Sequence, residues 1–222
     1  MKSVRLGERG NGSRLIGRVS IAAALGLSAA SASAQAELRV LDCATTFAKS
    51  ASEATLVKAF DRANVVSAEL DGAEGSTERG TVLFPKDAAR RVEIFWHDTR
   101  QRRRPATVRV RRNSTWSIAP ATPSARALTV GLSLDDVAAI NGRPFSLSGF
   151  GWDMGGYATD WKGGRLDTIA GGCSLSVRFD PDPKVTGSAL DRASGDKPLS
   201  SSGPVARAVR PIVSEISLGW PE

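Results

Sequence analysis

The chain is poor in the residues on which most enzymatic chemistry depends. It has one histidine and two cysteines among 222 residues. His97 is therefore the one base available to a Ser–His–Asp triad, and no serine lies in a Gly-x-Ser-x-Gly turn. A single histidine and two cysteines that we expect to be paired leave no usual set of zinc ligands. The sequence predicts no metal site and no cofactor, and it favours a protein that is not an enzyme.

The chain also lacks an apolar run long enough to cross a membrane. Its most apolar stretch, Val19–Ala30, is shorter than the about 20 residues that a spanning helix needs. This stretch follows a basic segment and precedes two small-x-small cleavage sites within residues 32–36. Such an order is typical of a secretory signal peptide. We therefore expect residues 1–36 to be removed on export to the periplasm, and the mature chain to hold no transmembrane segment.

The basic character of the chain lies partly in that leader. The whole chain has 30 basic and 23 acidic side chains, and residues 1–36 hold five basic and one acidic, so 25 and 22 remain. This small excess weakens the case for nucleic acid, and we expect no nucleic-acid partner. One local basic cluster remains, and it can be a solvated turn, which we favour, or a site for an acidic ligand. Its members are Arg100, Arg102, Arg103, Arg104, Arg109, Arg111 and Arg112.

Cys43 and Cys173 both lie in the expected mature chain. Each cysteine lies at the end of a candidate strand, and terminal strands of a sheet often meet. In an oxidising periplasm, such a pair can close a long loop and restrict the unfolded chain. We therefore predict a disulfide between Cys43 and Cys173.

Hydrophobic periodicity predicts an α+β fold of antiparallel meander sheets, each preceded by a short helix. In residues 37–118, a capping-box pattern at Ser50–Glu53 starts a helix that runs to Phe60. Four strands with alternating or β-branched residues follow this helix. Their expected ranges are 65–70, 81–84, 92–97 and 107–112.

Residues 125–180 repeat this plan. A second capping box at Ser133–Asp136 starts a helix, and Asn141-Gly142 can end it in a left-handed conformation. A hairpin of strands 145–153 and 156–161, then strands 165–168 and 173–180, are expected after it. Two related halves are one interpretation of the repeated plan. Residues 181–204, rich in Pro, Gly and Ser, predict a flexible loop, and residues 205–222 predict a final strand that returns to the sheet.

The segment Leu128–Leu166 is dense in aromatic residues and glycine. Rings on one face of a strand must pack into the core, whereas an exposed Trp or Tyr can anchor a partner. We expect Trp152, Tyr157, Trp161 and Arg165 to form a binding surface. Its partner would be a periplasmic or envelope protein, or cell-wall glycan.

The order of motifs in this segment resembles uncharacterised exported proteins of Gram-negative bacteria. The matching residues are Asn141-Gly142-Arg143-Pro144-Phe145, then Gly149-Phe150-Gly151-Trp152-Asp153 and Gly155-Gly156. At the level of fold, the order of a short helix, the motif Asn-Gly-x-Pro and a strand resembles a module of the outer-membrane assembly lipoproteins. The same module occurs twice in the β-lactamase-inhibitor proteins. This resemblance implies a protein that binds a partner over a sheet face. The chain departs from the assembly lipoproteins because it has no lipobox cysteine, and from both of these fold-level relatives by its Gly-rich hairpin with two Trp. No binding residue is carried over.

Two functions of different class follow from these observations. The first is a non-catalytic, inhibitor-like module that binds a protein or the cell wall. The second is a carbohydrate or cell-wall hydrolase that uses Asp153 and Asp160, because carboxylates beside aromatic rings are common in such sites. Aspartates beside turns are also ordinary turn formers, so we favour the binding module.

Overall fold

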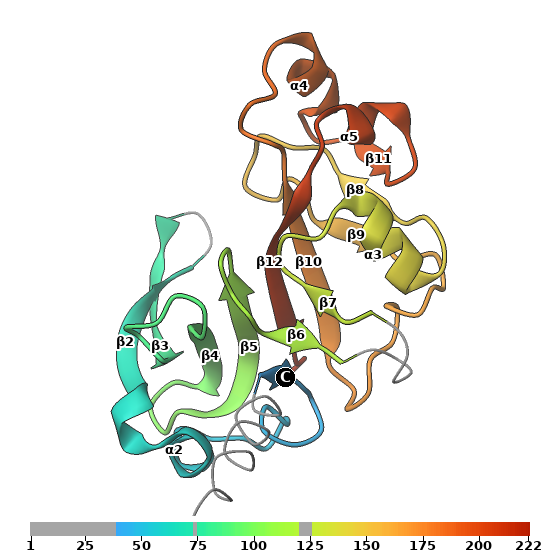
Figure 1. Cartoon of the computed structure of the whole chain (residues 1–222). Helices are drawn as coiled ribbons and strands as arrows, with labels where there is room; N and C mark the ends of the chain where they lie inside the picture. The colour runs from blue at the N-terminus through green and yellow to red at the C-terminus, as the bar shows by residue number, and fades with distance from the viewer. Residues whose placement is uncertain (1–38, 73–74, 120–125) are drawn as a thin grey trace, which may run out of the picture.

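The computed structural model describes residues 39–72, 75–119 and 126–222. The expected signal peptide, residues 1–36, lies outside the described residues. The described ranges contain four α-helices and twelve strands, and almost all strand pairs are antiparallel (Figure 1). The α+β class with antiparallel meander sheets, predicted from periodicity, is confirmed.

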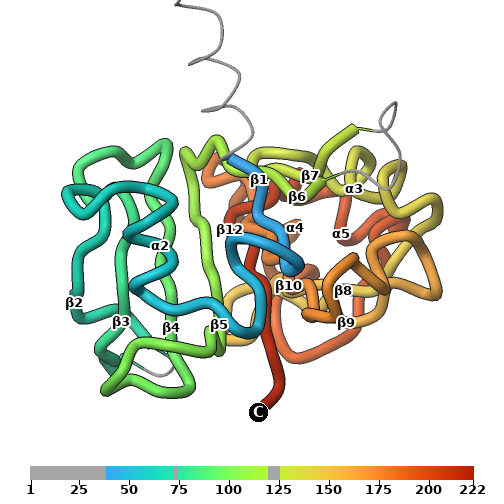
Figure 2. The backbone as a smooth tube through the Cα atoms, turned by 90° about the horizontal axis from the view of Figure 1, so that it is seen from below, coloured from blue at the N-terminus to red at the C-terminus, as the bar shows by residue number. Residues whose placement is uncertain are grey.

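A six-stranded antiparallel sheet forms the centre of the molecule. Its strand order is β10-β12-β5-β4-β3-β2. The C-terminal strand β12 therefore lies inside the sheet, between β10 and β5, and joins the strands of the first half to those of the second (Figure 2). The bounds are β2 Val65–Asp71, β3 Thr77–Leu83, β4 Val92–Asp98, β5 Arg103–Arg111, β10 Ser174–Asp180 and β12 Ile212–Gly219.

Two small three-stranded sheets flank this central sheet. In the first, of order β1-β6-β7, β1 is parallel to β6. In the second, of order β11-β8-β9, all pairs are antiparallel. The bounds are β1 Val40–Leu41, β6 Ser117–Ile118, β7 Leu128–Thr129, β8 Ser146–Ser148, β9 Ala158–Asp160 and β11 Pro198–Ser200.

The helices are short and begin at side-chain caps where the sequence offers them. In α3 (Leu134–Asn141), Ser133 and Asp136 form the expected capping box, and Gly142 ends the helix at φ 84°. In α2 (Glu53–Phe60), the capping box is formed by Ser52 and Thr55 and not by Ser50 and Glu53. The remaining helices are the 3₁₀ turn η1 (Arg62–Asn64), α4 (Ser188–Ala193) and α5 (Pro204–Ala208).

The main apolar core lies against one face of the central sheet. Under the first-half strands, the rings of Phe47, Phe60 and Trp116 lie 5.8–6.2 Å apart. Under the second-half strands, the ring of Phe145 lies 5.0 Å from Trp161 and 5.6 Å from Phe179. Cys43 and Cys173 are buried at the edge of this core and form the predicted disulfide. A smaller apolar cluster consists of Leu70, Val82 and Phe95.

Several expected elements differ from those observed. Residues 181–204 contain α4 and β11 and pack against the core through Ala193, so this segment is not a structureless loop. Residues 165–168 form turns and no strand, and only Ser146–Ser148 of the expected strand 145–153 is extended. The second half does not build a meander of its own, because β10 and β12 add to the strands of the first half. These differences come from long-range pairing, which local periodicity does not encode.

Candidate functional site

One face of the central sheet packs against the core and α2, and the opposite face, here called the outer face, carries charged side chains. On β5, Val108 and Val110 are buried, whereas Arg109 and Arg111 alternate with them. The register places Arg178 of β10, Glu215 of β12 and Arg111 side by side. Sheets that are antiparallel commonly leave one face polar in this way.

Ion pairs connect these side chains across the outer face. Arg109 Nη2 lies 2.8 Å from Glu93 Oε2, and both side chains are almost buried, at 12% and 11% exposure. Arg111 lies 3.3 Å from Glu215 and 3.8 Å from Glu93. The guanidinium of Arg109 also covers the ring of Phe95, with its carbon 4.7 Å from the ring centre. The outer face therefore has a polar floor whose side chains hold one another in place.

The loop between β8 and β9, residues 149–157, is tied to this floor. The hydroxyl of Tyr157 donates to Glu215 Oε1 at 3.3 Å, and Arg178 Nε donates to the carbonyl of Gly155 at 3.1 Å. Burial raises the pKa of Tyr157, and the charge of Glu215 adds to this shift. The tyrosine therefore remains a protonated donor near neutral pH.

A groove of about 530 Å³ lies between this loop and the β2–β3 turn. Gly72, Gly75 and Glu78 form one wall, and Asp153, Met154 and Tyr157 form the other. The floor consists of outer-face side chains of β4, β5, β10 and β12. We refer to this hollow as the sheet groove.

Exposed apolar side chains gather at the loop that forms this wall. Of the described residues, four large hydrophobic side chains are exposed, and two of these are Met154 (59%) and Trp152 (36%). The indole nitrogen of Trp152 donates to the carbonyl of Gly149 at 3.0 Å, which fixes the ring. The sequence predicted Trp152 and Tyr157 but not Met154. The signal that could have found Met154 is its place at the glycine-flanked tip of a loop, where side chains are usually exposed.

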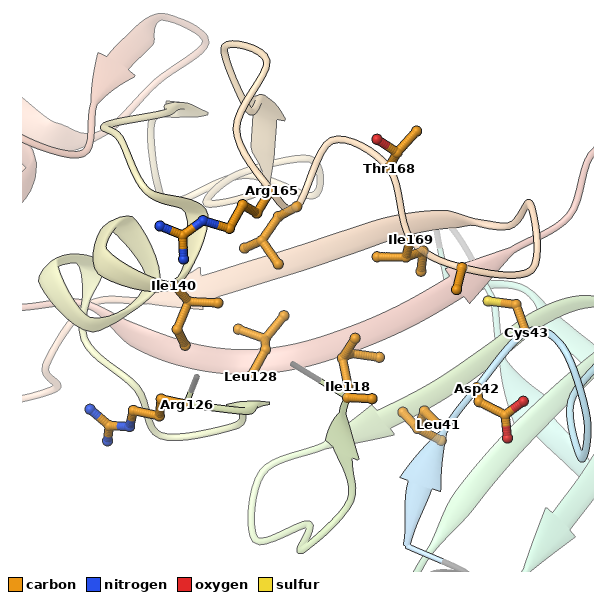
Figure 3. A pocket seen from close by; sticks show the side chains of 13 residues that line it. Leu41, Asp42, Cys43, Ile118, Arg126, Leu128, Ile140, Arg165, Thr168 and Ile169 are labelled. Carbon is orange, nitrogen blue, oxygen red and sulfur yellow. The ribbon is translucent and has the colours of Figure 1, made fainter. Parts of the chain in front are cut away.

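The other predicted site residues lie elsewhere. Trp161 is buried at 7% exposure and packs on Phe145, so its ring offers no surface to a partner. Arg165 lines a separate apolar pocket (Figure 3).

The two aspartates of the hydrolase hypothesis have different environments. Asp153 lines the sheet groove, whereas Asp160 is not among its lining residues. The carboxylate of Asp160 lies 2.7 Å from Lys162 Nζ and accepts a hydrogen bond from the Lys162 amide, also at 2.7 Å. These bonds lower the pKa of Asp160, which is opposite to what a general acid requires. The geometry therefore gives no support to a catalytic pair of these residues.

The arginine cluster at residues 100–112 does not form one basic ridge. Arg102 lies 2.5 Å from the buried carboxylate of Glu53, and Arg103 lies 2.9 Å from Asp98. Arg112 is paired with Asp180. Together with Arg109 and Arg111, five of the seven arginines are thus paired with carboxylates of the same chain. Most of this positive charge is neutralised within the fold.

Neither a metal-ligand cluster nor a membrane-spanning helix is found in the part of the chain that the structure describes. Within residues 39–72, 75–119 and 126–222, no group of three or more His, Cys, Asp and Glu side chains is placed to hold a metal ion. None of the helices in the same ranges combines the length and apolar character that crossing a bilayer requires. No protein-family model, curated protein or solved structure matches the chain.

Proposed function

We propose that this protein is an exported, non-catalytic binding module that holds a segment of a partner protein in the sheet groove. The observation that carries this proposal is the exposed side chain of Met154, which lines the groove, together with exposed Trp152 two residues earlier in the same loop. Exposed Trp and Met side chains are frequent anchors at protein interfaces. Export to the periplasm belongs to the same proposal, and a disulfide is consistent with an oxidising compartment.

The floor of the groove supports binding rather than chemistry. Arg109, Arg111 and Arg178 are held by hydrogen bonds, ion pairs or ring contacts to other residues of the fold. A surface that is ordered before binding loses little side-chain entropy when a partner arrives. Because the floor pairs its own charges, we expect apolar anchoring at Met154 and Trp152 to provide most of the affinity. An inhibitor-like role follows if the bound segment belongs to the active region of the partner.

A site-specific crosslink tests this proposal. A photoreactive amino acid would replace Met154 in one variant and Lys58 in a matched control. Lys58 is exposed on α2, on the side of the sheet opposite the groove. Irradiation in living cells should give one discrete protein adduct at position 154 and none at position 58. The adduct at 154 should weaken at least about fivefold when Trp152 is changed to Ala. A Trp anchor often contributes about 2 kcal/mol or more to the free energy of binding.

The control measurements separate the alternatives. Sedimentation with purified peptidoglycan that depends on Trp152, in the absence of any protein adduct, would replace the protein partner with a glycan. Equal adducts at positions 154 and 58, or no adduct and no sedimentation, would contradict a binding role for the groove. Circular dichroism of each variant verifies that the fold is retained.

A further inference from the structure

A second pocket, of about 340 Å³, lies beside the small sheet β1-β6-β7. Its lining is mostly apolar, with two arginines at one end (Figure 3). We call it the Arg165 pocket. Its apolar lining comes from five separate parts of the chain, namely β1, β6, β7, the end of α3 and the segment 165–170. The side chains concerned are Leu41, Ile118, Leu128, Ile140, Leu166 and Ile169.

The charged groups of this pocket lie at opposite ends. Figure 3 shows Arg165 and Arg126 on either side of Ile140, and Asp42 at the far end near Cys43. The carboxylate of Asp42 accepts hydrogen bonds from the amides of Ala44 and Thr45 and from the Thr45 hydroxyl, at 2.6–3.0 Å. Asp42 is thus engaged in its own turn. The end near Ile140 is left electropositive.

Arg165 is the charged group of this pocket that is available to a ligand. Its guanidinium makes no ion pair or hydrogen bond with any residue in the described ranges, whereas Arg126 lies 2.5 Å from Asp136. The guanidinium packs against Gly142, where a Cβ atom would lie 3.0 Å from Arg165 Nη2. This contact places the cation at the C-terminus of α3, whose partial negative charge favours it there.

We propose that the Arg165 pocket binds a single-chain anionic amphiphile. The alkyl chain would lie on the apolar lining, and the carboxylate or phosphate head would accept hydrogen bonds from Arg165, with Arg126 nearby. A guanidinium is the side chain best suited to a planar carboxylate or a phosphate. The volume lies at the low end of the range for small-molecule sites, which fits one short chain better than a two-chain lipid. This inference is independent of the sheet groove.

Titration calorimetry of the purified protein with four probes tests the chemistry of the ligand. Decanoate and decyl phosphate carry both head and chain, decanol carries the chain alone, and acetate carries the head alone. All are used below the concentration at which they form micelles. We expect decanoate or decyl phosphate to bind at one site per chain, and to bind about tenfold or more tightly than decanol and acetate, because a charge-assisted hydrogen bond and a buried chain both contribute. The stronger of the two anions identifies the head group.

Two variants and a matched control locate the site. Arg165→Gln should weaken binding of the anionic probe about tenfold while leaving that of decanol unchanged. Ile169→Glu, at a partly exposed position, introduces a carboxylate into the apolar lining and should abolish binding of both anions. Arg192→Gln removes an exposed arginine of α4, distant in the fold from the pocket lining, and should leave every affinity unchanged.

Some results would overturn the inference. Equal affinity for decanoate and decanol would show that the anionic head group is not recognised. An equal loss of affinity in Arg165→Gln and Arg192→Gln would show that the ligand does not bind at Arg165. No binding of any probe to the wild-type protein would refute it outright. The crosslink at Met154 does not depend on these variants. A negative result at the Arg165 pocket therefore leaves the proposed function unaffected, and a negative crosslink at Met154 leaves the Arg165 pocket unaffected.

Discussion

At the scale of single residues, Gly156 joins the groove loop to the sheet. Its backbone has φ 78°, and its carbonyl accepts a hydrogen bond from the Phe179 amide at 2.9 Å. A Cβ atom at this position would lie 2.1 Å from the carbonyl oxygen of Phe179. Backbone cannot yield as a flexible side chain can. Glycine is therefore required here both for its backbone conformation and for the close approach of the groove loop to the backbone of β10.

Gly156→Ala should consequently be strongly destabilising. We expect a loss of about 3 kcal/mol or more in the free energy of unfolding, from left-handed strain and overpacking together. Gly172→Ala is the matched control, because Gly172 has φ 75° but no atom within 4 Å of an added Cβ. Its cost should be about 1 kcal/mol, from the backbone alone. Urea denaturation measures both, and equal losses would show that the close approach to Phe179 has no energetic weight.

A buried hydroxyl provides a second test at this scale. Thr81 Oγ1 accepts a hydrogen bond from the indole of Trp96 at 2.9 Å and donates to Glu53 at 2.9 Å. Thr81→Val keeps the shape but leaves the indole N–H of Trp96 without its acceptor, which should cost about 1–3 kcal/mol. Thr107→Val on the outer face, where the hydroxyl makes no such buried bond, should change stability by less than about 0.5 kcal/mol. A similar cost at both positions in chemical denaturation would contradict the role of the buried network.

At the scale of elements, α3 illustrates how local chemistry sets a helix start. The carboxylate of Asp136 accepts hydrogen bonds from the Ser133 hydroxyl at 2.8 Å and the Ser133 amide at 3.1 Å. These bonds lower the pKa of Asp136 below its usual 3.8. Ionised Asp136 therefore stabilises the folded state. The contribution is complete above the unfolded pKa and is lost as pH falls through the lower folded pKa.

Asp136→Asn should show this pH dependence directly. We expect it to reduce the free energy of unfolding by about 0.5–1 kcal/mol at neutral pH, because a negative charge near a helix N-terminus is stabilising. The difference from wild type should shrink as pH falls through the lowered folded pKa of Asp136, because the wild-type carboxylate then loses its charge. Asp167→Asn, which alters an exposed carboxylate with no hydrogen bond or ion pair to the described residues, should match wild type throughout. A deficit that persists at low pH would assign the effect to shape and not to charge.

The final strand shows where local pattern and tertiary pairing diverge. Strict alternation predicts that Ile212, Ser214, Ile216, Leu218 and Trp220 share one face. Ile216 and Leu218 of β12 and Trp220 just after it are buried, but Ile212 is 41% exposed and Val213 is buried in its place. The pairing register with β10 shifts between Arg178 and Phe179, so one extra residue of β12 is accommodated there. Such a bulge depends on both strands and reverses the alternation beyond it.

At the scale of the whole molecule, the disulfide joins the start of the described chain to β10. It closes a loop with a sequence separation of 130 residues. Reduction, or the double variant Cys43→Ala/Cys173→Ala, should lower the free energy of unfolding by about 2–5 kcal/mol, because the unfolded chain gains freedom. Urea denaturation with and without reductant measures this, and the double variant should not respond to reductant. An unchanged unfolding midpoint in the reduced wild-type protein would contradict a stabilising role.

Features that depend on near neighbours could be predicted from the amino-acid sequence. The capping box and glycine end of α3, the alternation in β4 and β10, and the α+β class follow from adjacent residues or from composition. The disulfide was predicted because the two cysteines lie at the ends of candidate strands. The sequence singled out Trp152 and Tyr157 as aromatic residues beside glycines, and their role in binding stays a prediction. It did not single out Met154, since the exposure of Met154 depends on what the loop covers.

How these parts come together depends on the packing of the folded chain. The insertion of β12 between β10 and β5, the burial of Trp161 against Phe145 and the ordered elements in residues 181–204 rest on contacts between distant segments. The sheet groove and the Arg165 pocket are assembled in the same way, each from several separate stretches of chain. Hydrophobic periodicity indicates which face of a strand is buried, but strand order and the shape of the space between elements arise from packing of the complete chain.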